Sequence, residues 1–198
     1  MKDNQRKLIY TAMFAAVVVV LQMFVSIPLG IMFTITLTLV PIMLGAILFG
    51  PLCGAILGGV FGVVVAIQVV TGAAGPASAL MFTQAPVITI VLCILKGAVA
   101  GWVSGLIYKA VMKMEKPNLA VILSAVACPI VNTGIFCLGL VVFYNNLLHQ
   151  WSIAGGYASA FTFIMLGMIG LNFVVEFAVN VLLIPVTLRM IKIVKRLL

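Results

Sequence analysis

Apolar residues dominate the chain in six long runs, separated by short polar or glycine- and proline-rich links. Each run approaches or exceeds the roughly 20 residues that a helix needs to cross about 30 Å of hydrocarbon. No strand pattern competes with this interpretation, because unpaired strands cannot cross lipid. The sequence therefore predicts an all-α integral membrane protein, a single bundle of six transmembrane helices. The expected helices cover approximately 8–26, 33–49, 52–70, 83–108, 119–144 and 157–187.

Composition supports the bilayer as the solvent of this chain. Hydrophobic residues make up 65% of the 198 residues and charged residues only 7%, whereas soluble domains carry about 25% charge. So few charges cannot cover a water-facing surface. The four cysteines lie inside apolar runs and form no CxxC or Cys/His cluster, so we expect neither a metal site nor a cofactor.

The basic residues predict how the bundle is oriented. Ten of the 11 Lys and Arg residues fall at the N-terminal end, in the link between the fourth and fifth helices, or in the C-terminal tail. The links on the opposite side, 27–36, 71–82 and 145–156, contain no Lys or Arg. The positive-inside rule then places both termini in the cytoplasm. Because the basic residues flank apolar runs and do not interleave with aromatic residues, nucleic acid is not an expected partner.

Motifs for catalysis and for ATP hydrolysis are absent from the sequence. It contains no phosphate-binding GxxxxGK[ST] loop, no HExxH and no GxSxG, and its one histidine, His149, lies in an expected outer link. An enzyme is therefore not expected. Binding or transport of a solute is the favoured class of function.

Small residues recur at every fourth position in several helices. This spacing puts them on one helical face, where the absence of side chains lets a neighbouring backbone approach closely. The third helix carries Gly54, Gly58 and Gly62, and the fourth carries Gly97, Gly101 and Gly105. For these glycines, packing within the chain is favoured over dimerisation. The first helix carries Ala12 and Ala16, with Ala15 beside them, and this face fits either internal packing or a docking surface.

Polar groups lie at a similar depth in three of the apolar helices. Lys96 and Glu176 each lie about 13 residues, or roughly 20 Å, from the basic boundary, and Asn132 lies at a similar depth in the fifth helix. Asn172, Glu176 and Asn180 are spaced by four, so they share one stripe of the sixth helix. An ionisable group at the centre of a helix costs at least ~2.5–3.5 kcal/mol on insertion into lipid. The stripe is therefore expected to face the bundle.

Two interpretations of this polar layer stay open. Lys96 and Glu176 form an internal ion pair, or each holds an opposite charge on a ligand. Further substrate-binding candidates lie beside Asn132 or nearer the expected outer mouth: Thr133, Gln84 and Trp151.

Several local patterns resemble those of the substrate-binding S components of energy-coupling factor (ECF) transporters. The segment 48–54, LFGPLCG, resembles the FGPxxG turn between helices two and three, and 95–102, LKGAVAGW, resembles the KGxxAG segment of helix four. Residues 131–133, VNT, resemble the NT of helix five in the pantothenate- and folate-like branch. Ala12-x-x-x-Ala16 matches the AxxxA that such proteins use for docking.

This resemblance implies capture of a vitamin or related micronutrient from outside a prokaryotic cell, at the plasma membrane, in the pantothenate-, folate- or riboflavin-like branch. It implies that Ala12, Ala15 and Ala16 dock on a transmembrane coupling subunit, and that two ATPases supply the energy. Lys96 suits an anionic group of such a ligand, and Glu176 suits an amine or another hydrogen-bond donor. Two alternatives stay open: an ion-coupled secondary carrier with Glu176 as its proton site, and a scaffolding subunit.

Overall fold

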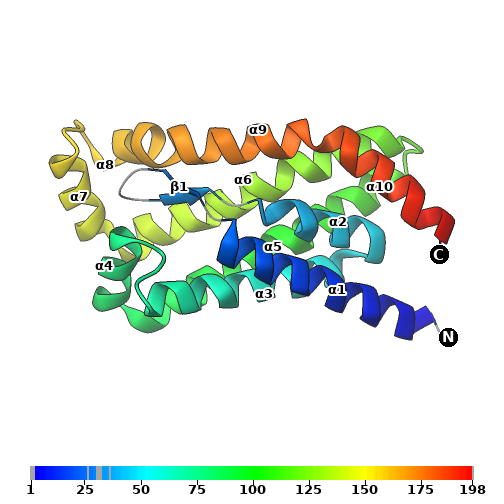
Figure 1. Cartoon of the computed structure of the whole chain (residues 1–198). Helices are drawn as coiled ribbons and strands as arrows, with labels where there is room; N and C mark the ends of the chain where they lie inside the picture. The colour runs from blue at the N-terminus through cyan, green and yellow to red at the C-terminus, as the bar shows by residue number, and fades with distance from the viewer. Residues whose placement is uncertain (1–2, 26, 30–32, 36, 198) are drawn as a thin grey trace.

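Most of the chain is helical in the computed structural model, which describes residues 3–25, 27–29, 33–35 and 37–197 (Figure 1). The long helices are α1 (Asp3–Phe24), α3 (Pro51–Val70), α5 (Pro86–Met112) and α6 (Pro117–Phe143). Shorter ones are α2 (Leu39–Phe49), α4 (Pro76–Gln84) and α7 (Asn145–Ala154). A C-terminal arm follows, made of α8 (Ala160–Thr162), the π-helix η1 (Phe163–Phe173), α9 (Val174–Leu182) and α10 (Ile184–Leu197).

The long helices match the thickness of a bilayer. Within the described residues, α1, α3, α5 and α6 are long and apolar enough to cross it. The pair α9–α10, bent by 42°, is a fifth candidate if it is counted as one span. Large apolar side chains are exposed along these helices, among them Leu52 and Val87 at 73% and Leu182 at 75%. Such a surface is suited to lipid. The chain is therefore a multi-pass membrane protein.

A short β-hairpin interrupts the expected second helix. α2 begins at Leu39, not at residue 33, and its 11 residues rise only roughly 16 Å. Before it, β1 (Ile27–Leu29) and β2 (Phe33–Ile35) pair antiparallel, with Ile27 opposite Ile35. This pair is a local departure from an otherwise helical chain, and β2 packs against η1 of the bundle (Figure 1).

Two other expected helices are divided. The predicted helix over 83–108 breaks at Ala85, and Pro86, which lacks an N–H, begins α5. The predicted helix over 157–187 is replaced by the C-terminal arm, which contains a π-helix and extends to Leu197. The expected helices over 8–26, 52–70 and 119–144 correspond to α1, α3 and α6, with ends that differ by at most five residues.

Both termini lie at the same end of the bundle, together with the turn between α5 and α6 (Figure 1). Lys109, Lys113 and Lys116 belong to this turn and its flanks and are exposed. We call this end of the molecule the basic end. The short helices α4, α7 and α8 lie at the opposite end (Figure 1).

α3 and α5 pack backbone to backbone. A Cβ atom added at Gly58 would collide with the Gly97 carbonyl, and one added at Gly97 would collide with the Gly58 carbonyl. Gly54 and Gly101 face each other in the same way. The outer glycines of the two stripes meet other backbone atoms, Gly62 against Cys93 and Ile94, and Gly105 against Pro51. The glycine stripes thus coincide with a contact inside the chain.

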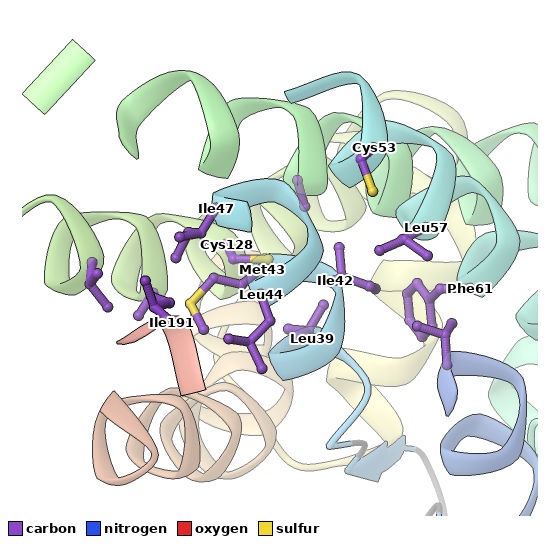
Figure 2. Close-up of a cluster of buried hydrophobic side chains, with 14 of the residues drawn as sticks. Leu39, Ile42, Met43, Leu44, Ile47, Cys53, Leu57, Phe61, Cys128 and Ile191 are labelled. Carbon is purple, nitrogen blue, oxygen red and sulfur yellow. The ribbon is translucent and has the colours of Figure 1, made fainter. Parts of the chain in front are cut away.

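The short helix α2 forms the centre of the main apolar cluster. Figure 2 shows its side chains Leu39, Ile42 and Met43 directed into the space shared with α3, α6 and α10. Leu57, Phe61, Cys128 and Ile191 from these neighbours belong to the same cluster (Figure 2). Burial on nearly all sides holds α2 in place although it is too short to cross a membrane.

We expect Gly58→Ala to destabilise the protein by about 1–3 kcal/mol, because the added methyl group has to push two backbones apart. The neighbouring Gly59 is the matched control, since a Cβ atom there meets nothing within 4 Å. Gly59→Ala should be neutral or slightly stabilising, because alanine is the better helix former. Thermal unfolding of both variants in detergent measures the difference, and equal midpoints would contradict the close contact.

Candidate functional site

Lys96 places a cation between α5 and α6. Its Nζ atom lies 4.6 Å from the centroid of the Phe136 ring, a cation–π geometry, and its side chain is half-buried. One turn away on the same stripe of α5, Leu92 packs against Gly139 of α6. Lys96 therefore belongs to the face of α5 that contacts α6.

Asn132 lies one helical turn before Phe136 and so shares its face of α6. Its side chain is 8% exposed, and its Oδ1 atom has no hydrogen-bond partner. A buried acceptor without a donor is costly, by about 1–3 kcal/mol. The predicted candidate Thr133 follows at the next position, partly exposed. Lys96 and Asn132 thus offer a donor and an acceptor at neighbouring levels of the bundle.

Glu176 and Asn180 share the buried face of α9, at 6% and 2% exposure. Asn180 donates a hydrogen bond from Nδ2 to the Glu176 carbonyl at 2.8 Å. α9 packs against α6, which carries Asn132. The Lys96 ammonium itself lies over the Phe136 ring of α6.

Asn172, the remaining member of the predicted stripe, has a side chain outside the described part of the structure. Its backbone belongs to η1, whereas Glu176 belongs to α9. A π-helix bonds residue i to i+5, so a spacing of four no longer means one face across this junction. The prediction of a shared face therefore applies only to Glu176 and Asn180.

Gln84 and Trp151 lie away from the polar layer. Gln84 is exposed at the last position of α4. Trp151 is not in a loop, as expected, but in α7, where it is 7% exposed and its ring centroid lies 6.4 Å from that of Phe163. It belongs to a second apolar cluster that includes Leu140 and Tyr144. Its aromatic ring is used in packing there.

A hydrogen-bonded cluster that the sequence reasoning missed joins α1, α3 and the start of α2. Gln22 donates from Nε2 to Gln68 Oε1 at 2.9 Å, and Gln68 donates from Nε2 to the Gln22 carbonyl at 3.1 Å. The Thr38 hydroxyl donates to Gln22 Oε1 at 3.1 Å. Glutamine at two positions within apolar runs was the signal available in the sequence. The cluster fixes the segment that leaves the hairpin.

Serine and tyrosine hydroxyls join α5 to α6 at two further levels. The Ser104 and Ser124 hydroxyls lie 2.7 Å apart, and Ser124 also donates to the Ser104 carbonyl at 2.9 Å. Near the opposite end, the Thr89 and Tyr144 hydroxyls lie 2.6 Å apart. All four side chains are buried, and each has its partner.

The three alanines of α1 do not share one environment. Ala12 and Ala16 are exposed, whereas Ala15 is half-buried and packs against the main apolar cluster. Exposed apolar side chains surround the two outer alanines, among them Met13 at 59% and Val20 at 52%. Of the three alanines, only Ala12 and Ala16 therefore form a small-residue face on the outside of α1.

Comparison with known proteins identifies the family. The family model described as "ECF transporter, substrate-specific component" matches residues 6–188. The chain belongs to this family. Among solved structures it is similar to ThiT from Listeria monocytogenes, with a TM-score of 0.63 and 20% sequence identity over 96% of this chain and 99% of that chain. This likeness shows a shared fold, and a search of curated proteins found no match.

Membership of this family establishes the class of function of the chain. It is a substrate-binding S component of an ECF importer, and the family implies a vitamin-like substrate and transmembrane and ATPase partners. The secondary carrier and the scaffolding subunit, both left open by the sequence, receive no support from the comparisons.

Because Trp151 is buried in the second cluster, we expect Trp151→Ala to destabilise the S component by about 3 kcal/mol or more. Trp102, which is 48% exposed on α5, provides the control, and Trp102→Ala should change stability little. Thermal unfolding of the two variants in detergent tests this. A smaller loss for Trp151→Ala than for Trp102→Ala would contradict the packing role.

Proposed function

We propose that this S component captures a vitamin or related micronutrient that carries an anionic group, in the pantothenate-, folate- or riboflavin-like group of ligands. The observation that carries the proposal is the position of Lys96. Its ammonium lies over the Phe136 ring of α6, and one helical turn from Phe136 on that helix is Asn132, whose Oδ1 atom has no partner. A ligand with an anionic group and a neighbouring hydrogen-bond donor would satisfy both side chains.

Glu176 forms the opposite wall of the proposed site. Its burial on α9, which packs against α6, supports a place near Asn132. There it would accept a hydrogen bond from an amine or hydroxyl of the ligand. Thr133, which follows Asn132 on α6, would border the same region. The S component binds and carries its ligand and catalyses no reaction itself.

The proposed orientation places the basic end in the cytoplasm of a prokaryotic cell, with the chain in its plasma membrane. The exposed lysines of the α5–α6 turn, at the same end as both termini, support this under the positive-inside rule. Substrate would then enter from the end that carries α4 and α7. The hairpin and α2 together would serve as the second of six membrane passages.

Transport would require a transmembrane coupling subunit and two ATPases. We place the docking surface on α1, at Ala12 and Ala16, because both are exposed and small enough for another helix to approach closely. Ala15, the third predicted member, packs inward and would contribute only by holding α1 against the core.

Mass spectrometry of the protein purified in mild detergent should reveal a co-purified anionic micronutrient. With that compound as the probe, we expect Lys96→Met to weaken binding more than tenfold, or by about 1.4 kcal/mol or more. Lys109→Met, which removes an exposed charge at the basic end, should leave the dissociation constant unchanged. Equal affinities of the Lys96→Met variant and the wild type would remove Lys96 from the site.

A tryptophan at Ala12 or Ala16 should abolish uptake by the assembled transporter, because the bulky ring prevents close approach of the coupling subunit. Ligand binding by the isolated variants should stay near normal. Ile67→Trp on α3, an exposed apolar position at 57%, is the control and should preserve uptake. If the α1 variants lost binding and uptake together, the docking role would be refuted.

A further inference from the structure

Buried polar side chains on the two sides of the bundle differ in whether they have hydrogen-bond partners. Towards α1, α3 and α5, the buried hydroxyl and amide groups have partners, among them Gln22, Thr38 and Ser104. On α6 and the C-terminal arm, three buried oxygen atoms in the described part of the chain have none. They are Asn132 Oδ1 on α6, Asn180 Oδ1 on α9 and Thr187 Oγ1 on α10. We call the contact between α6 and α9–α10 the C-terminal seam.

The two residues of the arm are almost completely enclosed, at 2% for Asn180 and 1% for Thr187. The orientation of the Asn180 amide is fixed, because its Nδ2 atom donates to the Glu176 carbonyl. Its Oδ1 atom is therefore directed away from that carbonyl and needs a donor of its own. A threonine in a helix usually bonds a carbonyl of the preceding turn, but Thr187 Oγ1 does not.

The arm also carries features that let it move. η1 is a π-helix of 11 residues, a rare geometry that often accompanies function. α9 and α10 meet at a bend of 42°, and Pro185, just after it, lacks the N–H that would bond the preceding turn. By contrast, facing glycines hold α3 against α5, and reciprocal serine bonds hold α5 against α6. Opening is therefore easiest at the C-terminal seam.

The polar groups of the arm follow one another towards the basic end. Glu176 and Asn180 are one turn apart, and Thr187 lies seven residues further on, again on the buried face. On α10 this face is flanked by Ile184 and Ile191, which pack into the main apolar cluster. The series runs from the polar layer towards the end that carries both termini (Figure 1).

We propose that the C-terminal seam opens transiently and admits water from the basic end as far as the polar layer. Asn180 Oδ1 and Thr187 Oγ1, the two unpartnered oxygens of the arm, are the groups that bind this water. Lipid tails offer no hydrogen-bond donors, whereas a water molecule donates two hydrogen bonds and needs two to four polar partners in a buried site. Because the oxygen atoms lie at successive levels of the seam, several water molecules, one at each level, would be needed to donate to them. The seam is closed in the present structure, which leaves these atoms without partners.

Thiol accessibility tests the proposal without reference to any substrate. In a background in which Cys53, Cys93, Cys128 and Cys137 are replaced by alanine, single cysteines are placed by Asn180→Cys and Thr187→Cys. Ser104→Cys, at 0% exposure in the α5–α6 contact, is the matched control. Lys113→Cys, exposed in the α5–α6 turn, marks the membrane side on which the basic end lies. The probe is a membrane-impermeant cationic methanethiosulfonate, added to sealed vesicles of either orientation.

We expect the thiols at positions 180 and 187 to react at least tenfold faster than the one at 104, and only from the side that labels position 113. Reaction rates equal to that at position 104 would overturn the proposal. Labelling from the opposite side would do so as well.

Hydrogen–deuterium exchange of the wild-type protein in nanodiscs provides a second measurement, because a variant can fail to fold. Amides at 180–187 should exchange at least tenfold faster than those at 100–107 of α5. Equal protection of the two stretches would show that the seam stays dry.

Discussion

The architecture depends on the direct contact between the backbones of α3 and α5. Helices in lipid gain nothing from expelling water between them, so their association has to come from close packing. Gly54, Gly58, Gly97 and Gly101 remove the side chains that would keep the two helices apart. The resulting pair forms a stiff base for the rest. α2 and α6 both pack against this pair.

The candidate site combines this stiff base with less regular elements. α5 and α6 bring Lys96 and Asn132 to neighbouring levels, and the C-terminal arm supplies Glu176. A π-helix and a bend lie in that arm, and a hairpin packs against it. The long helices thus position Lys96 and Asn132, while the arm that carries Glu176 contains the irregular segments. Such a division suits a protein that has to hold a ligand and later release it.

The sequence was informative wherever helix periodicity and lipid exclusion act alone. The glycine stripes, the buried polar layer and α1, α3 and α6 follow from spacing and depth. The sequence did not predict the strands before α2, because tertiary contacts stabilise them. They are held by their own pairing and by η1, and residues 27–35 show no alternation of polar and apolar positions that would indicate a strand. Trp151 was expected in a loop because polar residues surround it, but α7 turns its ring inward against Phe163. The π-helix likewise has no spacing signature that distinguishes it from an α-helix.

The way α1 is attached determines how force applied to it spreads. Near the basic end its Tyr10 ring stacks on Phe49 of α2, with centroids 5.6 Å apart. Near its other end Gln22 is bonded to Gln68 and Thr38. Clamped at both ends, the helix can neither twist about its axis nor bend away without breaking these attachments. Force applied to its outward face is therefore passed directly to α2 and α3 through these attachments.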